Sequence, residues 1–338
     1  MKLLVTGGAG FIGSNFVRHV LRERSDVEVV TLDALTYAGN LANLADVAGD
    51  PRHEFVRGDI TDAAAVRRLV ERGIDAVVHF AAESHVDRSI EDPEVFLKTN
   101  LIGTHVLLDA ARRARVRRFL HVSTDEVYGS LGAEGKFTED SPLRPGSPYA
   151  ASKAAADLLV LACVNTYGID AVITRSSNNF GPYQFPEKVI PLFVTNALAD
   201  EPLPLYGDGG NVRDWIHVED HCAALLLLVD RGRSGQVYNV SASEEHTNRQ
   251  LTAAILRRLG KPETLIRLVA DRPGHDRRYA LDAGKLRRET GWEPRRRFDE
   301  ALEGTIAWYR ENEGWWRAVK SGEYRRFYEQ WYGGRLRA

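Results

Sequence analysis

The first 33 residues alternate strand, glycine-rich turn, helix and strand, and this unit limits the possible fold more than any other part of the chain. The apolar segment 3–6 predicts a buried strand, and an amphipathic helical segment follows it. Between them lie three glycines at a spacing of three, Gly7, Gly10 and Gly13. Small residues at these positions let the backbone approach a pyrophosphate, to which the helix presents its N-terminal amides and positive dipole.

The second strand, 27–32, ends at Asp33, which lies 20 residues after Gly13. This is the distance at which an acidic residue meets the adenosine ribose hydroxyls of NAD. A carboxylate at this position repels the additional phosphate of NADP. The N-terminal unit therefore predicts a dinucleotide site that prefers NAD.

Strand-like and helix-like segments continue to alternate along the first half of the chain. Strands are expected near residues 3, 28, 55, 76, 119 and 172. This alternation predicts an α/β fold with a Rossmann-like doubly wound parallel sheet. Beyond residue 180 prolines and loops become frequent. We expect residues 1–180 to form an NAD-binding domain that also receives segments near 212–240, and residues 181–338 to form a smaller C-terminal α/β substrate lobe interleaved with it.

Titratable side chains gather where one of these strands ends. The apolar run 119–122 leads into Thr124, Asp125 and Glu126, and open α/β sheets place their chemistry at such strand ends. Asp125 and Glu126 form a carboxyl pair that can donate and accept protons. Mutual repulsion can keep one of them protonated near neutral pH while the other ionises.

A helix is predicted to begin shortly afterwards, because Ser147 can cap it and Pro148 suits its first turn. Tyr149 and Lys153 are then neighbours on one helical face. An ammonium beside a phenol favours the phenolate, so we expect the pKa of Tyr149 to move from about 10 toward neutrality. The pair would then act as a base toward a sugar hydroxyl.

Composition and charge narrow the class of protein. The net charge of −2 over 338 residues shows no bulk basic bias toward nucleic acid. No apolar run approaches the roughly 20 residues that cross a bilayer, and the N-terminus shows no signal-peptide pattern. Cys163 and Cys222 are expected to be core thiols, not a disulfide or metal site. We therefore expect a cytoplasmic protein with no metal, nucleic acid or membrane partner.

Other features leave alternatives open or point to partners. Segments 93–114 and 148–166 have wider apolar faces than one sheet contact needs, which favours a homodimer through these helices. Asp59 can accept from an adenine amino group or cap the helix that begins near residue 61. Arg213 suits diphosphate recognition, although loop arginines are commonly solvated. The aromatic segment 308–331 could stack on sugars, but packing of a helical tail is favoured.

The motifs together resemble the extended short-chain dehydrogenase/reductase family, in its nucleotide-sugar branch, and within it the dTDP-glucose 4,6-dehydratases. The residues that carry the resemblance are Thr6-Gly7-x-x-Gly10-x-x-Gly13, Ala81 to Ser89, Thr124-Asp125-Glu126-Val127-Tyr128-Gly129, Tyr149-x-x-x-Lys153, Ser177 to Tyr183 and Asp271 to Arg278. The likeness extends over nearly the whole chain. It implies conversion of dTDP-D-glucose to dTDP-4-keto-6-deoxy-D-glucose and water, for deoxysugar biosynthesis, with bound NAD recycled.

The resemblance also implies a role for each catalytic residue. Tyr149, aided by Lys153, removes the proton of the 4-hydroxyl while hydride leaves C4, and Thr124 hydrogen-bonds the same oxygen. Glu126 takes the C5 proton, and protonated Asp125 donates to the departing C6 hydroxyl. Hydride then returns to C6.

Two sets of binding residues follow from the same resemblance. On NAD it places Gly7, Gly10, Phe11, Ile12, Gly13, Asp33, Ala34, Leu35, Thr36, Asp59, Ile60, Phe80, Ala81, Ala82, Ser84, Thr99, Tyr149, Lys153 and Asn179. On the sugar nucleotide it places Ser84, Thr124, Asp125, Glu126, Tyr149, Asn178, Lys188, Val189, Pro204, Tyr206, Arg213, Asn248, Asp271, Arg272, Pro273, Gly274 and His275.

Two alternatives are another nucleotide-sugar enzyme of the same branch and a non-catalytic sensor. A UDP-hexose dehydratase or a 4-epimerase would share the fold. The pair of Asp125 and Glu126 argues against the 4-epimerase, which needs no acid for loss of the C6 hydroxyl. The UDP-hexose dehydratase stays open, because only a few contacts distinguish thymine from uracil. A non-catalytic NAD-binding sensor typically lacks the tyrosine, the lysine or the acids, all of which are present here.

Overall fold

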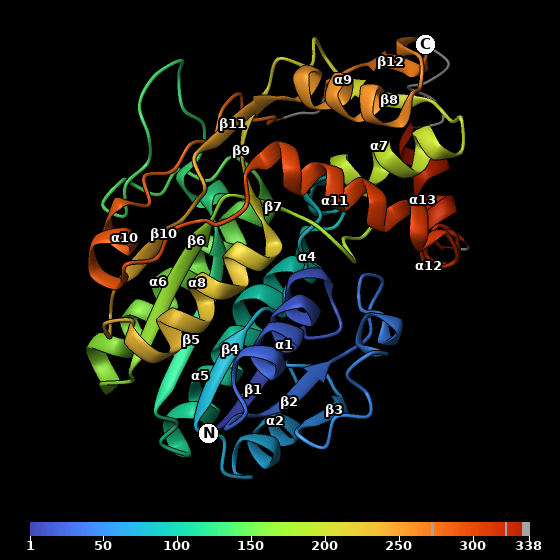
Figure 1. Ribbon diagram of the computed structural model, residues 1–338. Coiled ribbons are helices and arrows are strands. Elements are labelled where there is room, and N and C mark those ends of the chain that lie inside the picture. The colour runs from blue at the N-terminus through green and yellow to red at the C-terminus, as the bar shows by residue number, and fades with distance from the viewer. Residues whose placement is uncertain (272–273, 322, 333–338) are drawn as a thin grey trace.

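The large central sheet is parallel throughout. The computed structural model describes residues 1–271, 274–321 and 323–332, and within them seven strands pair in the order β10-β6-β5-β4-β1-β2-β3 (Figure 1). The strands are β1 (Lys2–Thr6), β2 (Glu28–Asp33), β3 (His53–Arg57), β4 (Ala76–His79), β5 (Arg118–Thr124), β6 (Ala171–Ser176) and β10 (Val237–Val240). The strand order reverses direction between β1 and β4, which creates the switch point at which such sheets bind ligands. The predicted doubly wound parallel sheet is confirmed.

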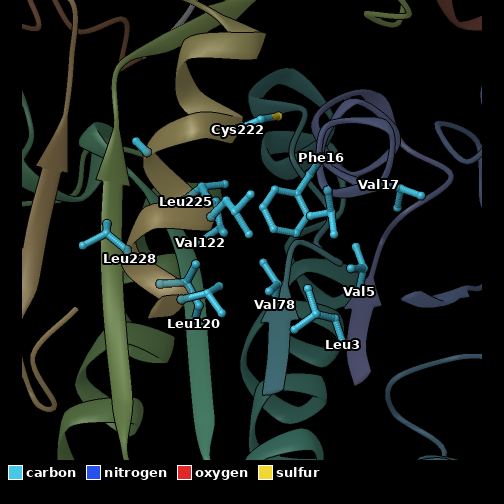
Figure 2. Close-up of a cluster of buried hydrophobic side chains, with 14 of the residues drawn as sticks. Leu3, Val5, Phe16, Val17, Val78, Leu120, Val122, Cys222, Leu225 and Leu228 are labelled. Atoms are coloured by element: carbon cyan, nitrogen blue, oxygen red, sulfur yellow. The ribbon is translucent and has the colours of Figure 1, made fainter. Parts of the chain in front are cut away.

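Helices cover both faces of this sheet. One face carries α1 (Phe11–Glu23) beside α8 (Val218–Arg231), and the other carries α2 (Ala63–Val70), α5 (Thr104–Arg113) and α6 (Pro148–Tyr167). Successive strand residues point to opposite faces, so Leu3 and Val5 pack under α1 while Leu4 packs on the other side. Figure 2 shows the first of these cores, in which Phe16 of α1 lies between the strands and the leucines of α8. Burial of apolar side chains on both faces stabilises the sheet.

The helix α6 begins as its sequence predicts. Ser147 accepts a hydrogen bond from the Ala150 amide at 3.2 Å, and Pro148 occupies the first turn. The helix ends at Gly168, whose φ of 69° lies in the left-handed region that glycine favours.

The segment predicted as one helix over 93–114 is helical without a break from Pro93 to Arg113, but its middle part has a wider turn. It consists of α4 (Pro93–Phe96), a π-helical stretch η2 (Leu97–Gly103) and α5. The wider turn allows Asn100 to reach inward: its side chain pairs with both backbone groups of Glu83 at 2.9 and 3.0 Å and donates to Ser152 Oγ at 2.8 Å. Such turns are frequent at functional sites.

The rest of the chain builds a smaller α/β region above the carboxyl ends of the large sheet (Figure 1). Its strands form two small sheets, β11-β9-β7 and β12-β8. The strands are β7 (Asn178–Phe180), β8 (Leu203–Tyr206), β9 (Val212–His217), β11 (Glu244–Thr247) and β12 (Ile266–Val269). The helices are α7 (Val189–Leu198), α9 (Asn248–Leu259), α10 (Gly284–Thr290), α11 (Phe298–Glu311), α12 (Glu313–Val319) and α13 (Glu323–Tyr332).

The segment 212–240 is shared between the two parts. Its strand β9 lies in a small sheet, whereas α8 and β10 belong to the large one. The division of the chain into domains at residue 180 stays a prediction.

Several aromatic and thiol side chains lie where the sequence suggested. Tyr309 and Trp316 are buried in the core of the smaller region, as expected of a packed tail. Cys163 and Cys222 are buried free thiols. Over the described ranges, no helix has both the length and the apolar character needed to span a membrane.

Candidate active site

A cavity of about 320 Å³ opens at the carboxyl edge of the large sheet, at the switch point between β1 and β4. Every residue that the resemblance places on NAD lines it except Leu35. Leu35 instead packs its side chain against the core that contains Phe16 and Val17 of α1, and its predicted contact with the cofactor stays a prediction.

The glycine loop forms one wall of this cavity. Gly7 has a φ of 70°, and a Cβ on Gly13 would lie 2.2 Å from the Gly7 carbonyl oxygen. The loop can close only with glycine at these positions. The residue before α1 is Gly10, so no side chain caps the first amides of this helix. These amides belong to Phe11, Ile12 and Gly13, which line the cavity, and they remain available to an anionic ligand.

Asp33 lies at the end of β2, as predicted, and its carboxylate is fixed. It accepts hydrogen bonds from the Leu35 amide at 2.8 Å and the Ala9 amide at 3.0 Å. Burial raises the pKa of Asp33, and these two bonds oppose the increase. The carboxylate keeps further lone pairs for ribose hydroxyls.

Buried polar atoms along the cavity show that it suits a polar ligand such as NAD. Among the described residues, Ser177 Oγ, Asn178 Oδ1 and Gln184 Oε1 are buried without a hydrogen-bond partner, and all three residues line the cavity. Unpaired buried polar atoms are costly, so they mark positions that a ligand can satisfy.

The structure resolves the two readings of Asp59 in part. Asp59 accepts from the Thr61 amide at 2.8 Å, but the residue that caps α2 is Asp62, which accepts from the Ala64 and Ala65 amides at 3.0 Å. The predicted cap at Asp59 is therefore wrong by three residues, because the helix begins later than expected. Asp59 lines the cavity, so the contact with adenine stays a prediction.

The carboxyl pair occupies a short 3-10 turn, η3 (Asp125–Tyr128), directly after β5. Thr124 caps this turn by accepting from the Glu126 amide at 3.3 Å, and its hydroxyl lies 3.3 Å from Asp125 Oδ1. Burial raises the pKa of Asp125 well above its ordinary value, and repulsion by Glu126 adds to the effect. The expected protonated carboxyl is therefore Asp125, although burial is the larger cause.

Tyr149 and Lys153 both line the cavity from α6, beside Thr124 and Glu126. Lys153 is buried and donates from Nζ to the Val122 carbonyl oxygen at 2.8 Å. Burial raises the pKa of Tyr149 and the Glu126 carboxylate raises it further, while burial lowers the pKa of Lys153 to about 8. The predicted shift of Tyr149 toward neutrality is wrong for the protein alone, because burial penalises the phenolate and the nearby Glu126 carboxylate adds to the effect.

A second cavity of about 160 Å³ adjoins the first and extends into the smaller region. Four residues line both cavities, Glu126, Asn178, Glu187 and Lys188. Six of the predicted sugar-nucleotide residues line only the second cavity, and they are Val189, Pro204, Tyr206, Arg213, Asn248 and His275. Residues distant in sequence are thus brought together at one extended site.

The predicted loop 271–275 is only partly in place. Asp271 and Gly274 do not line either cavity, and Arg272 and Pro273 lie outside the described residues. His275 Nδ1 lies 2.5 Å from Asp271 Oδ1, so Asp271 orients a residue of the second cavity.

The cations of the second cavity are held by backbone carbonyls. Arg213 donates to the Val212 and Asp276 carbonyl oxygens at 2.8 and 2.9 Å and lies 4.4 Å from the ring centre of Tyr279. Lys188 donates to the Ser84 carbonyl oxygen at 2.8 Å. Fixed positive charges of this kind suit a diphosphate.

The sequence reading missed residues that the fold adds to the site. Glu187 lies at the junction of the two cavities, and its Oε2 atom is 3.7 Å from Arg88 Nε. Burial raises the pKa of Glu187 to about 7, against the attraction of Lys188 and Arg88. The only signal in the sequence was its position directly before Lys188. Tyr332 of α13 also lines the second cavity, and nothing in the sequence indicated it.

Comparison with known proteins agrees with this geometry. Residues 4–305 match the family model described as GDP-mannose 4,6 dehydratase. A dTDP-glucose 4,6-dehydratase of Streptomyces niveus is 53% identical over 325 residues, 95% of this chain and 96% of its own length. A dTDP-glucose 4,6-dehydratase of Shigella flexneri is 48% identical over 361 residues, which cover 99% of this chain and 100% of the relative.

Solved structures are similar over the same extent. A dTDP-glucose 4,6-dehydratase from Streptomyces venezuelae with NAD and TYD bound is 57% identical, has a TM-score of 0.93, and is matched over 95% of this chain and 100% of its own. A UDP-glucose 4-epimerase of Thermus thermophilus in complex with NAD is 35% identical, with a TM-score of 0.86, matched over 92% and 100%.

Proposed function

The chain belongs to the GDP-mannose 4,6-dehydratase family, and from that premise we propose that it is an NAD-dependent dTDP-glucose 4,6-dehydratase. It converts dTDP-D-glucose to dTDP-4-keto-6-deoxy-D-glucose and water, a hydro-lyase reaction of deoxysugar biosynthesis. The observation that carries the proposal is the group of Thr124, Asp125 and Glu126 at the end of β5, which lines the first cavity beside Tyr149 and Lys153. The close relatives that carry this name share about half of their residues with the chain.

The first step needs a base at the C4 hydroxyl. When bound, NAD would supply the hydride acceptor for C4 and the hydride donor for C6, and its positive charge would favour the Tyr149 phenolate. Tyr149 removes the hydroxyl proton, the Lys153 ammonium stabilises the phenolate, and Thr124 hydrogen-bonds the reacting oxygen. Oxidation at C4 makes the neighbouring C5 proton acidic.

The second step needs an acid and a base with different protonation states. Asp125 holds its proton because it is buried next to Glu126, so it can donate to the leaving C6 hydroxyl, which departs as water. Glu126 borders both cavities and removes the C5 proton. After hydride returns to C6, Glu126 gives the proton back to C5, and both carboxyl groups can act again once Asp125 regains a proton.

The remaining assignments complete the proposal. The residues of the first cavity bind NAD, and those of the second bind the nucleoside diphosphate, with Arg213 and Lys188 on its phosphates. Residues 1–180 form the NAD-binding domain, and the enzyme works in the cytoplasm. The alternatives are less favoured: a 4-epimerase has no use for a protonated Asp125, and a sensor has no need of the complete catalytic group.

The enzyme is proposed to act as a homodimer. Large apolar side chains are exposed on the helices predicted for this contact, with Leu158 of α6 57% and Ile102 of η2 51% exposed. Replacing both by glutamate should give a monomer in light scattering. Leu268→Glu is the matched control, because this leucine is 58% exposed on β12, away from these helices. A monomeric native protein would contradict the proposal.

The reaction itself is tested with purified protein and dTDP-glucose, without added reductant. The alkali-induced absorbance of a 4-keto-6-deoxy sugar is followed beside the absorbance of NADH. Product without net NADH is expected of a dehydratase that recycles its cofactor. A C4 epimer, or net NADH, would favour another enzyme of the branch. No reaction with any hexose nucleotide, despite bound NAD, would favour the sensor. A parallel assay with UDP-glucose measures the preference for thymine over uracil in the sugar nucleotide.

A further inference from the structure

The helix α6 carries a third ionisable residue in line with the catalytic pair. Tyr149, Lys153 and Asp157 follow one another at intervals of four residues, so they lie on one face of the helix. All three are buried, and the Asp157 side chain is fully so. None of the proposed reaction steps uses Asp157.

Asp157 is held by groups from the neighbouring strands. Arg175 of β6 donates from Nε to Asp157 Oδ2 at 2.9 Å, and His121 Nε2 of β5 lies 3.4 Å from Oδ1. Arg175 also donates to the Tyr128 hydroxyl at 3.0 Å, and that hydroxyl donates to Asn239 Oδ1 at 2.8 Å. Arg175 therefore ties the carboxylate to β6 and, through Tyr128 and Asn239, to η3 and β10.

Two cations lie near Asp157: Arg175 is its direct partner, and Lys153 is one helical turn away on α6. Arg175 is a permanent cation, whereas burial lowers the pKa of His121 to about 4, so this imidazole is neutral at physiological pH. His79 of β4 is also neutral, because burial lowers its pKa well below the usual range. The nearest polar partner of Lys153 is the neutral Val122 carbonyl. An ammonium that is buried against a neutral carbonyl needs an anion to remain charged.

Two other acids face the same helix from η3, and neither fills this role as Asp157 does. Burial and the neighbouring Glu126 raise the pKa of Asp125 well above its usual range, which disfavours its charged form, and Glu126 is assigned to the substrate. The attraction that opposes the loss of the Lys153 proton comes from Asp157.

We propose that Asp157 is a positioning residue: its carboxylate, fixed by Arg175 and His121, is the buried counter-charge that keeps the Lys153 ammonium protonated, and it acts on the Tyr149 proton transfer through Lys153 without touching the substrate. The inference deepens the proposed function and rests on it for the kinetic readout. It assigns a catalytic consequence to a carboxylate that lies behind the site and lines neither cavity.

The kinetic test is the pH dependence of kcat for the NAD-loaded enzyme with dTDP-glucose. Asp157→Asn keeps the shape of the side chain and removes its charge, so Lys153 should lose its proton at lower pH. We expect the alkaline limb of the profile to move to lower pH by about one unit, because a neighbouring charge shifts a pKa by at least about this amount. Asp157→Glu keeps the charge and should restore the limb.

A matched control breaks the same ion pair but leaves the anion in place. Arg175→Met removes the partner of Asp157 without removing the charge that Lys153 senses, so its alkaline limb should not move to lower pH. A purely structural role would affect Asp157→Asn and Arg175→Met alike. Equal downward shifts in both variants, or no shift in Asp157→Asn, would overturn the proposal.

A second measurement reads Lys153 directly and does not depend on turnover. Titration of ¹⁵N-labelled lysine side chains by NMR, with the Lys153 signal assigned from Lys153→Met, should show a lower Lys153 pKa in Asp157→Asn than in the native protein. If the single variant does not fold, Asp157→Asn/Arg175→Met leaves no unpaired charge at this position, and its Lys153 pKa should still be lower than in the native protein. An unchanged Lys153 pKa refutes the inference. Absence of turnover in the native protein counts only against the proposed function.

Discussion

Lys153 donates from Nζ to the carbonyl oxygen of Val122 at 2.8 Å, so the lysine of the Tyr-x-x-x-Lys pair is anchored to the end of the sheet strand that leads into the acids. Val122 lies two residues before Thr124 on β5. This bond joins the start of α6, which carries Tyr149, to the end of β5, which leads into the carboxyl pair. The main chain of the sheet therefore holds the lysine of the proposed catalytic pair.

Removal of the Tyr149 hydroxyl should slow the first oxidation. Tyr149→Phe keeps the ring, whose neighbour is Phe96, but supplies no base at the C4 hydroxyl. We expect a loss of about 10²–10⁴-fold in the single-turnover rate of NADH formation. NAD and dTDP-glucose should still bind, which calorimetry can verify. An unchanged rate of C4 oxidation would remove Tyr149 from this role.

The acid at C6 can be separated from the base at C4. Asp125→Asn removes the donated proton, so elimination should slow by about 10²–10⁴-fold while C4 oxidation stays detectable. Rapid-quench analysis of the 4-keto-glucose and 4-keto-6-deoxy intermediates distinguishes the two steps. Equal loss of both steps would contradict the assignment of Asp125 as the acid.

Exchange at C5 reports on the base that removes the C5 proton. Glu126→Gln has no carboxylate to take this proton, so incorporation of solvent deuterium at C5 should fall by a similar factor. Mass spectrometry of the sugar nucleotide recovered from D₂O measures the exchange. Unimpaired exchange in the variant would show that another group acts at C5.

Glu187 should make stability depend on pH in an unusual direction. Burial raises its pKa from 4.5 to about 7, so the folded protein favours the neutral form. Its contribution to stability is present below pH 4.5 and is lost as the pH rises through 7. Glu187→Gln should therefore raise the free energy of unfolding at pH 8 by up to about 3 kcal/mol, and Tm with it, and leave both unchanged near the unfolded pKa. As a control, Glu71→Gln replaces an exposed glutamate and should change neither the free energy of unfolding nor Tm. A lower Tm for Glu187→Gln in alkaline buffer would contradict the prediction.

The glycine loop should not accept a methyl group at its third glycine. A Cβ on Gly13 would meet the Gly7 carbonyl oxygen and the Gly8 Cα, both part of the backbone. We expect Gly13→Ala to weaken NAD binding by more than about tenfold, since the pyrophosphate rests on this turn. Fluorescence titration with NAD measures the loss. Gly304→Ala is the matched control, because its Cβ would meet no atom within 4 Å, and alanine should even stabilise α11. Equal affinities of the two variants for NAD would exclude the predicted role of the loop.

Much of this protein was determined by local sequence. The strand-turn-helix unit around Gly7 and Gly13, the Ser147 cap and the pairing of Tyr149 with Lys153 depend on residues within about one or two helical turns of one another. Such features follow from backbone geometry and side-chain periodicity, so the sequence alone predicted them. The sheet also followed, because a regular alternation of strands and helices has few ways to fold.

Burial and long-range proximity were decided only by the tertiary structure. The pKa of Tyr149 is raised because packing buries most of its side chain and brings Glu126 close to it, and no spacing along the chain reports that. Glu187 meets Glu126 at one junction although 61 positions separate them, and Asp157 meets Arg175 across two elements. The sequence could supply the chemical groups, but their solvation and their neighbours exist only once the helices and strands have packed, since both are properties of the whole surrounding set of atoms.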